Sequence, residues 1–330
     1  MTDQRPVALI TMATGYVGPS LARSLAVRGF DLMLQGAAGD DTMVGVEAPF
    51  AEQVPELEAL GATVHTITDV DLSSAEGNQA LVAATLDRFG RLDSACLVTG
   101  LIVVGKFLDM TIDQWERVKR MNLDMVFHGL QAVLAPMVEA KQGQVVVFTS
   151  ATGARPDPIT SIYGGTRAGA NGLVRAVGLE HARDGVQVNA VGTNYMDFPG
   201  FLKASRADTD PERRAAIEAQ VPMRRLGTMD ELAAFTSVLL DGSSRFQTGQ
   251  FVELTILGVG EAPFTPSSQP SVSETLEVSV MKVGRVTEGI GFIGDPDVMD
   301  TWATSSLCDR SLVARSTNAA PGMEAAMRSV

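Results

Sequence analysis

The sequence has few of the residues that build disulfide frameworks, metal sites or nucleic-acid surfaces. Only two of its 330 residues are cysteine and three are histidine, and their spacing matches no disulfide framework and no zinc site. Lysine and arginine number 26 against 39 acidic residues, and this net charge of −13 argues against nucleic acid or an anionic membrane as a partner. The longest apolar run, near 95–105, is too short to span a bilayer. Without an apolar export signal near its start, the chain is expected in the cytoplasm.

The remaining composition is that of a folded globular protein, with 45% hydrophobic and 20% charged residues. Short apolar runs alternate with longer amphipathic stretches as far as about residue 254, a pattern typical of βα units. It predicts an α/β fold with a Rossmann-like, doubly wound sheet of seven parallel strands and helices on both faces. The predicted strands are 7–11, 31–34, 63–67, 94–98, 144–149, 187–191 and 250–254. The predicted helices lie near 17–28, 51–60, 75–89, 112–140, 161–183 and 229–240.

The alternating pattern stops at about residue 261, where a stretch rich in proline and serine begins. We therefore predict that residues 1–260 form one catalytic domain and that 261–330 are a C-terminal extension, partly disordered or loosely structured. Within this extension, 275–281 alternates in the manner of a strand.

The turn after the first predicted strand, Thr11 to Gly18, stands where a dinucleotide-binding domain has its glycine-rich turn. In the T-G-x-x-x-G-x-G version of this turn, two glycine positions are taken by Met12 and Tyr16, and only Gly18 remains. A tyrosine ring at the second glycine position would lie about where the cofactor must lie, so nicotinamide binding is disfavoured.

The second strand also lacks the acidic residue that would hold an adenosine ribose, or an arginine for a 2′-phosphate. Asp40 and Asp41 lie a few residues further on and leave a dinucleotide open as an alternative.

A catalytic group is predicted where the fifth strand ends. Ser150 follows that strand, Tyr163 comes thirteen residues later, and Arg167 stands one helical turn beyond Tyr163 on the same helix face. Because ligands bind at the carboxyl ends of parallel strands, these three side chains should converge in one crevice. A phenol is protonated at neutral pH, but a permanent cation beside it favours the phenolate. Tyr163 can then exchange a proton with a substrate oxygen to which Ser150 donates a hydrogen bond.

These residues resemble the short-chain dehydrogenase/reductase superfamily, and within it the cofactor-free halohydrin dehalogenases. That family's first motif, T-x4-[F/Y]-x-G, is met by Thr11, Tyr16 and Gly18, and its second, S-x12-Y-x3-R, by Ser150, Tyr163 and Arg167. The segment Asn194-Tyr195-Met196 also looks like the halide or nucleophile pocket of the G-type enzymes, which accept cyclic and internal epoxides. The resemblance places the following residues around anion and substrate: Thr11, Tyr16, Gly18, Thr152, Thr193, Asn194, Tyr195 and Met196. Asn122 matches the superfamily's structural asparagine.

The resemblance implies a lyase without a redox cofactor or metal. Tyr163 would take the hydroxyl proton of a vicinal haloalcohol, and the alkoxide would displace halide to close an epoxide. In the reverse direction, azide, cyanide or nitrite would open the ring. The implied partners are a small haloalcohol or epoxide and small anions, with no nucleic acid and no membrane. Family members are usually homotetramers, with 112–140 and 161–183 at one interface.

Two other functions stay open from the residues alone. The first is a nicotinamide-dependent short-chain dehydrogenase/reductase with an unusual first turn. The second is a catalytically silent regulator that binds a small molecule in the same crevice.

Overall fold

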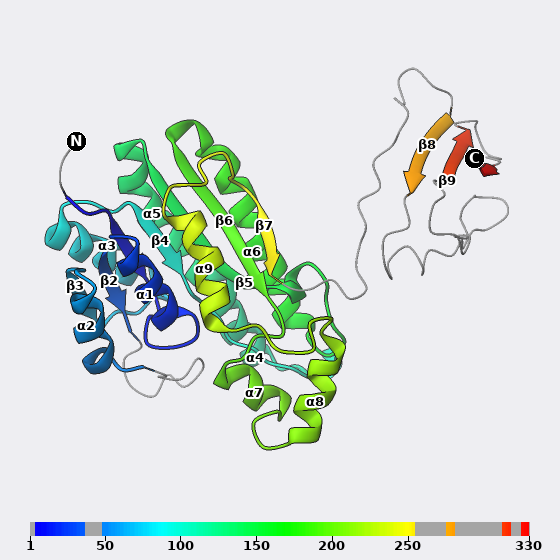
Figure 1. The fold of residues 1–330 in the computed structure, drawn as a ribbon, viewed down its shortest axis with the longest axis horizontal. Coiled ribbons are helices and arrows are strands. Elements are labelled where there is room, and N and C mark those ends of the chain that lie inside the picture. The colour runs from blue at the N-terminus through cyan, green and yellow to red at the C-terminus, as the bar shows by residue number, and fades with distance from the viewer. Residues whose placement is uncertain (1–3, 37–47, 255–274, 281–311, 318–324, 330) are drawn as a thin grey trace. The chain divides into compact units, whose positions relative to one another are not determined.

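The protein was analysed as a computed structural model that describes residues 4–36, 48–254, 275–280, 312–317 and 325–329 (Figure 1). The chain divides into two compact units, Met1–Thr255 and Ile256–Val330. The first unit carries the predicted α/β fold. The predicted linker and Asp40 and Asp41 lie outside the described residues.

The first unit contains one sheet of seven parallel strands in the order β3-β2-β1-β4-β5-β6-β7. β1 pairs with β2 on one side and with β4 on the other, so the chain reverses direction across the sheet at β1. The strands are β1 Val7–Ile10, β2 Asp31–Gln35, β3 Val64–Ile67, β4 Ser94–Leu97, β5 Gly143–Ser150, β6 Val186–Thr193 and β7 Phe251–Leu254. This doubly wound arrangement confirms the predicted fold class, and it places the ligand crevice at the carboxyl ends of β1, β4, β5 and β6.

Helices cover both faces of this sheet (Figure 1). They are α1 Gly18–Val27, α2 Phe50–Ala59, α3 Ala75–Phe89, α4 Ile112–Lys119, α5 Met125–Ala140, α6 Ser161–Glu180, α7 Pro199–Ser205, α8 Pro211–Gln220 and α9 Met229–Leu240. Several of these helices are capped at the N-terminus by a side-chain oxygen. Ser74 caps α3, and Thr111 and Thr228 form capping boxes at α4 and α9. Such caps satisfy backbone amides that have no partner within the helix.

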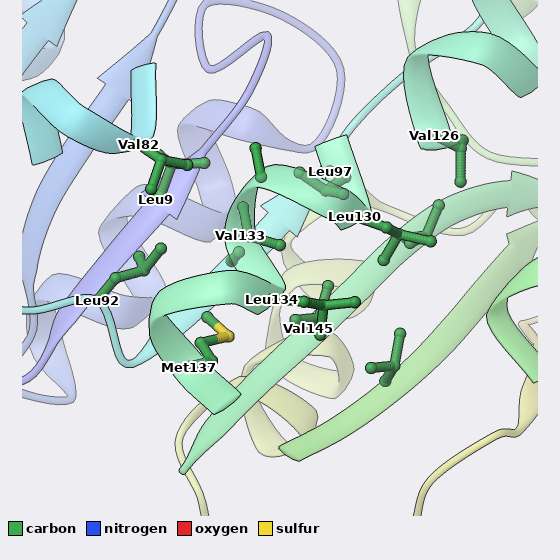
Figure 2. Close-up of a cluster of buried hydrophobic side chains, with 14 of the residues drawn as sticks. Leu9, Val82, Leu92, Leu97, Val126, Leu130, Val133, Leu134, Met137 and Val145 are labelled. Carbon is green, nitrogen blue, oxygen red and sulfur yellow. The ribbon is translucent and has the colours of Figure 1, made fainter. Parts of the chain in front are cut away.

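Two hydrophobic cores hold the layers together. One lies between the sheet and α3, α5 and α6, and the other between the sheet and α1, α2 and α9. In the first core, Leu130, Val133 and Met137 of α5 turn toward Leu97 and Val145 of the sheet (Figure 2). The two cores fix the carboxyl edge of the sheet as a rigid platform for the site.

Two local features differ from the sequence prediction. The predicted helix 112–140 is divided by a π-helical turn, Arg120–Asp124, which sets α5 off from α4. The short helix α7 was missed, and it begins with Pro199 at its first turn, where the absent N–H of proline costs nothing. Gly200 and Phe201 of α7 line the ligand cavity, and Asn122 of the π-helical turn is hydrogen-bonded to Leu101 of the loop after β4.

In the second unit, the described residues form a three-stranded antiparallel sheet in the order β10-β9-β8. Its strands are β8 Thr275–Val280, β9 Leu312–Thr317 and β10 Ala325–Ser329. β8 agrees with the strand predicted over 275–281. No helix among the described parts of the chain is long and apolar enough to cross a membrane.

Gly18 at the start of α1 is expected to tolerate no side chain. A Cβ atom on Gly18 would lie 2.6 Å from the Cα of Ala13, and both residues are buried. We expect Gly18→Ala to destabilise the fold by roughly 1–3 kcal/mol, because the backbone of the first turn must move. Gly172→Ala is the matched control: a Cβ there meets nothing within 4 Å in α6, and the change should be neutral or stabilising. Equal melting temperatures for both variants would contradict the close packing of the first turn.

Candidate active site

A cavity of about 310 Å³ opens at the carboxyl edge of the sheet, between the ends of β4, β5 and β6 and the helices α6 and α7. It is lined by Tyr16, Val98, Thr99, Gly100, Leu101, Ile102, Phe148, Thr149, Ser150, Thr152, Asp157, Thr160, Tyr163, Arg167, Thr193, Asn194, Tyr195, Met196, Phe198, Gly200 and Phe201. The cavity therefore collects side chains from segments more than a hundred residues apart in the sequence.

Ser150, Tyr163 and Arg167 all line this cavity. Ser150 is the last residue of β5, and its Oγ accepts a hydrogen bond from the backbone N–H of Thr152 at 3.2 Å. That contact fixes the rotamer of Ser150 and leaves its hydroxyl proton for another acceptor. Tyr163 stands in the first turn of α6 and is half-buried. The three groups thus face one volume, as their spacing predicts.

Arg167 is buried, with 4% of its surface exposed, and most of its hydrogen bonds go to the backbone. Its Nη2 donates to the carbonyl of Thr99 at 2.6 Å, and its Nη1 donates to the carbonyl of Phe148 at 3.2 Å and the hydroxyl of Thr99 at 3.3 Å. Its Cζ lies 5.4 Å from the centre of the Tyr163 ring, within the range of a cation–π contact. The guanidinium therefore connects α6 to β5 and to the loop after β4. It also places a fixed positive charge beside the phenol ring.

Gly100 makes room for this guanidinium. A Cβ atom on Gly100 would lie 1.9 Å from Nη2 of Arg167, and the φ of Gly100 is +142°. Both the space and the backbone conformation require glycine at this position.

The first turn has the backbone of a glycine-rich turn but carries side chains. Met12 and Tyr16 have φ values of +50° and +53°, in the left-handed region that glycine adopts most easily. The Tyr16 ring packs edge-on against Phe148, with centroids 5.7 Å apart, and against Phe198 at 4.8 Å. Its hydroxyl lies 2.7 Å from the hydroxyl of Thr193 at the end of β6. Burial raises the pKa of the Tyr16 phenol well above its usual value, so this group stays protonated.

The end of β6 and the segment after it form another wall of the cavity. Asn194 Oδ1 accepts a hydrogen bond from the N–H of Tyr195 at 2.9 Å, and Tyr195 has a φ of +55°. Met196 is buried and pairs with Gly227, which fastens this wall to the start of α9. Thr193, Asn194, Tyr195 and Met196 all line the cavity, together with Thr152 from the turn after β5.

Thr11 and Gly18, which the resemblance placed around anion and substrate, do not line the cavity. Asn122, which the resemblance gave a structural role, does not line it either. The hydroxyl of Thr11 donates to the carbonyl of Val98 at 3.0 Å and accepts from its N–H at 2.8 Å, so it ties β1 to β4. Gly18 is packed against Ala13 within the first turn. The amide of Asn122 donates to the carbonyl of Leu101 and accepts from its N–H, at 2.8 and 2.9 Å. These contacts position the walls of the cavity, and they leave Thr11 and Gly18 outside the pocket in which the sequence placed them.

Two groups of lining residues were missed by sequence analysis. The first is the loop after β4, from Thr99 to Ile102, which Asn122 and Arg167 hold in place. The second is Asp157 with the aromatic residues Phe198 and Phe201 of the α7 region. The available signal was their position after β4, β5 and β6, because loops that follow parallel strands at the carboxyl edge form the ligand crevice.

Metal and thiol chemistry have little support within the described residues. No group of three or more His, Cys, Asp and Glu side chains comes together there in a way that could hold a metal ion. Cys96 is buried in β4, and burial raises the pKa of its thiol. A thiolate nucleophile is therefore disfavoured at this position.

Comparison with known proteins places the chain in a family. Residues 17–254 match the family described as Enoyl-(Acyl carrier protein) reductase, which is more than half of the chain. The chain belongs to the short-chain dehydrogenase/reductase superfamily. It is 28% identical to D-beta-hydroxybutyrate dehydrogenase of Rhizobium meliloti over 75% of the chain and 96% of that protein. It is also 28% identical to Acetoacetyl-CoA reductase of an Acinetobacter species, over 77% and 97%.

Solved structures support the same placement. An actinorhodin polyketide ketoreductase with NADPH has a TM-score of 0.69 and 27% identity, with 77% of this chain and 97% of that one covered. An NAD⁺-bound xylitol dehydrogenase has a TM-score of 0.68 and 25% identity, with 77% and 99% covered. Both were solved with a nicotinamide dinucleotide bound.

These relatives overturn the finer expectation from the sequence. The assignment to the halohydrin dehalogenases, and to a carbon–halide lyase without a redox cofactor, is contradicted because the named relatives are dehydrogenases and reductases. The superfamily part of the resemblance holds. The motifs that carried the finer assignment describe a local arrangement of Ser, Tyr and Arg, and this arrangement serves any reaction that moves a proton at an oxygen atom.

The described first turn leaves less space for a nicotinamide dinucleotide than a glycine-rich turn does, so we expect the wild-type protein to bind this cofactor weakly. In this fold a glycine-rich turn leaves space for the diphosphate, whereas here the Tyr16 ring crosses the crevice from the end of β1 to Thr193 of β6. At the end of β2, the Gln35 side chain is buried, accepts from the N–H of Met12 at 2.9 Å and donates to the carbonyl of Gly36. It offers no carboxylate to a ribose.

Tyr16 is expected to set the affinity for dinucleotides. Because the backbone at this position already has a conformation suited to glycine, Tyr16→Gly should open the crevice and lower the Kd for NADPH or NAD⁺ about tenfold or more, which corresponds to ~1.4 kcal/mol. Tyr16→Phe, which keeps the ring and removes the hydroxyl that contacts Thr193, should leave the Kd nearly unchanged. Titration of both variants by nucleotide fluorescence or calorimetry checks this, and equal Kd values for Tyr16→Gly and wild type would contradict it.

Proposed function

We propose that the protein is an oxidoreductase of small alcohols and ketones, in which Tyr163 exchanges a proton with the substrate oxygen. The observation that carries this proposal is the convergence of Ser150, Tyr163 and Arg167 on one cavity at the carboxyl edge of the sheet. The reaction class is supported by the relatives, which are named as dehydrogenases and reductases.

Three residues of the cavity have separate roles at the substrate oxygen atom. Ser150 donates a hydrogen bond to the substrate oxygen while the N–H of Thr152 holds its Oγ in place. When a ketone becomes an alcohol, a bound nicotinamide nucleotide would supply the hydride to the carbonyl carbon and Tyr163 donates its proton to the oxygen; in the opposite direction Tyr163 accepts the proton and the hydride would return to the nucleotide. The buried charge of Arg167, 5.4 Å from the phenol ring, stabilises the ring when it is negative. Positioning and proton transfer are thus supplied by this chain's own side chains.

The test is a substrate screen in both directions. Purified full-length protein is incubated with neutral secondary alcohols or ketones and with either nicotinamide nucleotide, and nucleotide absorbance is followed. We expect turnover with at least one substrate, and about a thousandfold slower turnover in a Tyr163→Phe control. If no alcohol or ketone reacts with either nucleotide, in wild type or in Tyr16→Gly, the proposal fails.

We also propose that the protein assembles into a homotetramer. It is supported by an apolar groove of about 410 Å³ between α5 and α6, with Phe127, Leu134 and Leu173 among its lining residues. Phe127 is 44% exposed, which is costly for a phenyl ring that faces water. Light scattering coupled to size-exclusion chromatography should give four times the mass of the chain, and a monomeric mass would contradict this expectation.

A further inference from the structure

The charge of the cavity limits which substrates it accepts. Among the described residues that line it, only Arg167 and Asp157 carry a charge. Arg167 is buried and uses Nη1 and Nη2 for the carbonyls of Phe148 and Thr99, so its guanidinium cannot turn toward a ligand without leaving these carbonyls unpaired. Its Nε has no hydrogen-bond partner, but this atom is itself buried and is not exposed to the cavity. Asp157 is exposed and presents a carboxylate to whatever enters. A substrate anion therefore meets one like charge and no cation that is free to bind it.

Two arginines near the cavity are also engaged in ion pairs. Arg155, two residues before Asp157, is ion-paired with Glu253 of β7. Arg214 of α8 is paired with Asp197 and Glu218, at 2.6 and 2.9 Å. Neither is placed to neutralise a carboxylate in the cavity without breaking its own pair.

The walls of the cavity are mainly apolar. The apolar lining residues are Val98, Leu101, Ile102, Phe148, Met196, Phe198 and Phe201. Ile102 lines the cavity while half of its surface, 50%, is exposed, so an apolar group next to it would remove hydrocarbon from water on both sides.

We propose that the site takes uncharged ketones or alcohols that carry an apolar group beside the reacting carbon, and that Asp157 and Ile102 determine this specificity. The inference rests on the proposed function and goes beyond it by naming the substrate class. Burial of an unpaired carboxylate is costly, because an ion that leaves water needs a compensating charge or hydrogen bonds. Discrimination then arises from repulsion by Asp157 as well as from apolar contact with Ile102.

The experiment compares a substrate with its own anion. Full-length wild-type protein is assayed in the presence of reduced nicotinamide nucleotide with ethyl acetoacetate and with acetoacetate, which share the same ketone and differ by one charge. We expect kcat/KM for the ester to exceed that for the carboxylate by about tenfold or more. In Asp157→Asn this ratio should fall several-fold, whereas Asp87→Asn, which removes the same charge from the exposed surface of α3, should leave the ratio unchanged.

A second comparison tests the apolar contact between the substrate and Ile102. The ratio of kcat/KM for ethyl benzoylacetate over ethyl acetoacetate should fall roughly fivefold in Ile102→Ala, because the phenyl group loses its contact with the side chain. Equal use of ester and carboxylate by wild type would overturn the inference and leave the proposed function standing. Ratios that Asp157→Asn and Ile102→Ala leave unchanged would overturn the roles of these residues. Absence of turnover with these ketones alone would overturn the inference, whereas absence of turnover with every alcohol and ketone of the screen would overturn the proposed function, and the inference with it.

Discussion

Replacement of Tyr163 by phenylalanine is expected to lower kcat about a thousandfold while leaving the fold intact. The variant keeps the ring that Arg167 contacts at 5.4 Å, so packing in the first turn of α6 is preserved. It loses only the hydroxyl that exchanges a proton with the substrate oxygen, and such groups contribute roughly 10²–10⁴-fold to rate. Steady-state kinetics on a substrate found in the screen, together with a thermal unfolding scan, measures both parts of the prediction.

The matched control is Tyr195→Phe, which removes a hydroxyl from the same cavity. Tyr195 comes from the segment after β6 and is not part of the Ser150, Tyr163 and Arg167 group, so its loss should cost less than about tenfold. A Tyr163→Phe protein that retains kcat within tenfold of wild type would show that the proton comes from elsewhere.

Replacement of Arg167 by methionine is expected to lower both activity and stability. The substitution keeps the apolar stem but removes the hydrogen bonds to the carbonyls of Thr99 and Phe148. Each buried carbonyl left without a partner costs about 1–3 kcal/mol, so the melting temperature should fall by several degrees. Loss of the fixed charge beside the Tyr163 ring should lower kcat about a hundredfold.

Arg167→Lys distinguishes the contribution of the positive charge from that of the hydrogen bonds. Lysine keeps the positive charge but has a single nitrogen, which cannot reach both carbonyls in the way that the planar guanidinium does. We expect intermediate activity and a stability between those of wild type and Arg167→Met. Kinetics are measured well below the melting temperature of the weaker variant, and wild-type kcat in Arg167→Met would contradict the role of the charge.

The fold could be predicted from the sequence because its strands are short, continuous apolar runs separated by amphipathic helices. The predicted strands agree with the observed bounds to within a few residues at each end, including β5 Gly143–Ser150, which carries Ser150 at its last position. The π-helical turn Arg120–Asp124 was not predictable, because one inserted residue hardly disturbs a helical pattern of apolar residues. The helix α7 has only seven residues, too few to show a period.

The candidate site was predictable in part. Spacing placed Ser150, Tyr163 and Arg167 in one crevice, and the structure lines one cavity with all three. The contacts of Arg167 with Thr99 and Phe148 join residues 68 and 19 positions away, and no local pattern encodes them. The reaction class was predicted wrongly, since a short motif describes the groups around an oxygen atom but not which bond is made or broken at the neighbouring carbon.

The most direct test of the proposed oxidoreductase activity is the stoichiometry of turnover by the wild-type protein. A neutral ketone is incubated with reduced nicotinamide nucleotide, and the nucleotide oxidised is compared with the alcohol formed, by absorbance and by chromatography of the product. We expect one alcohol for each nucleotide oxidised, and about a thousandfold slower formation of alcohol in the Tyr163→Phe control. Absence of alcohol with both NADH and NADPH, in a protein whose fold is intact, would contradict it.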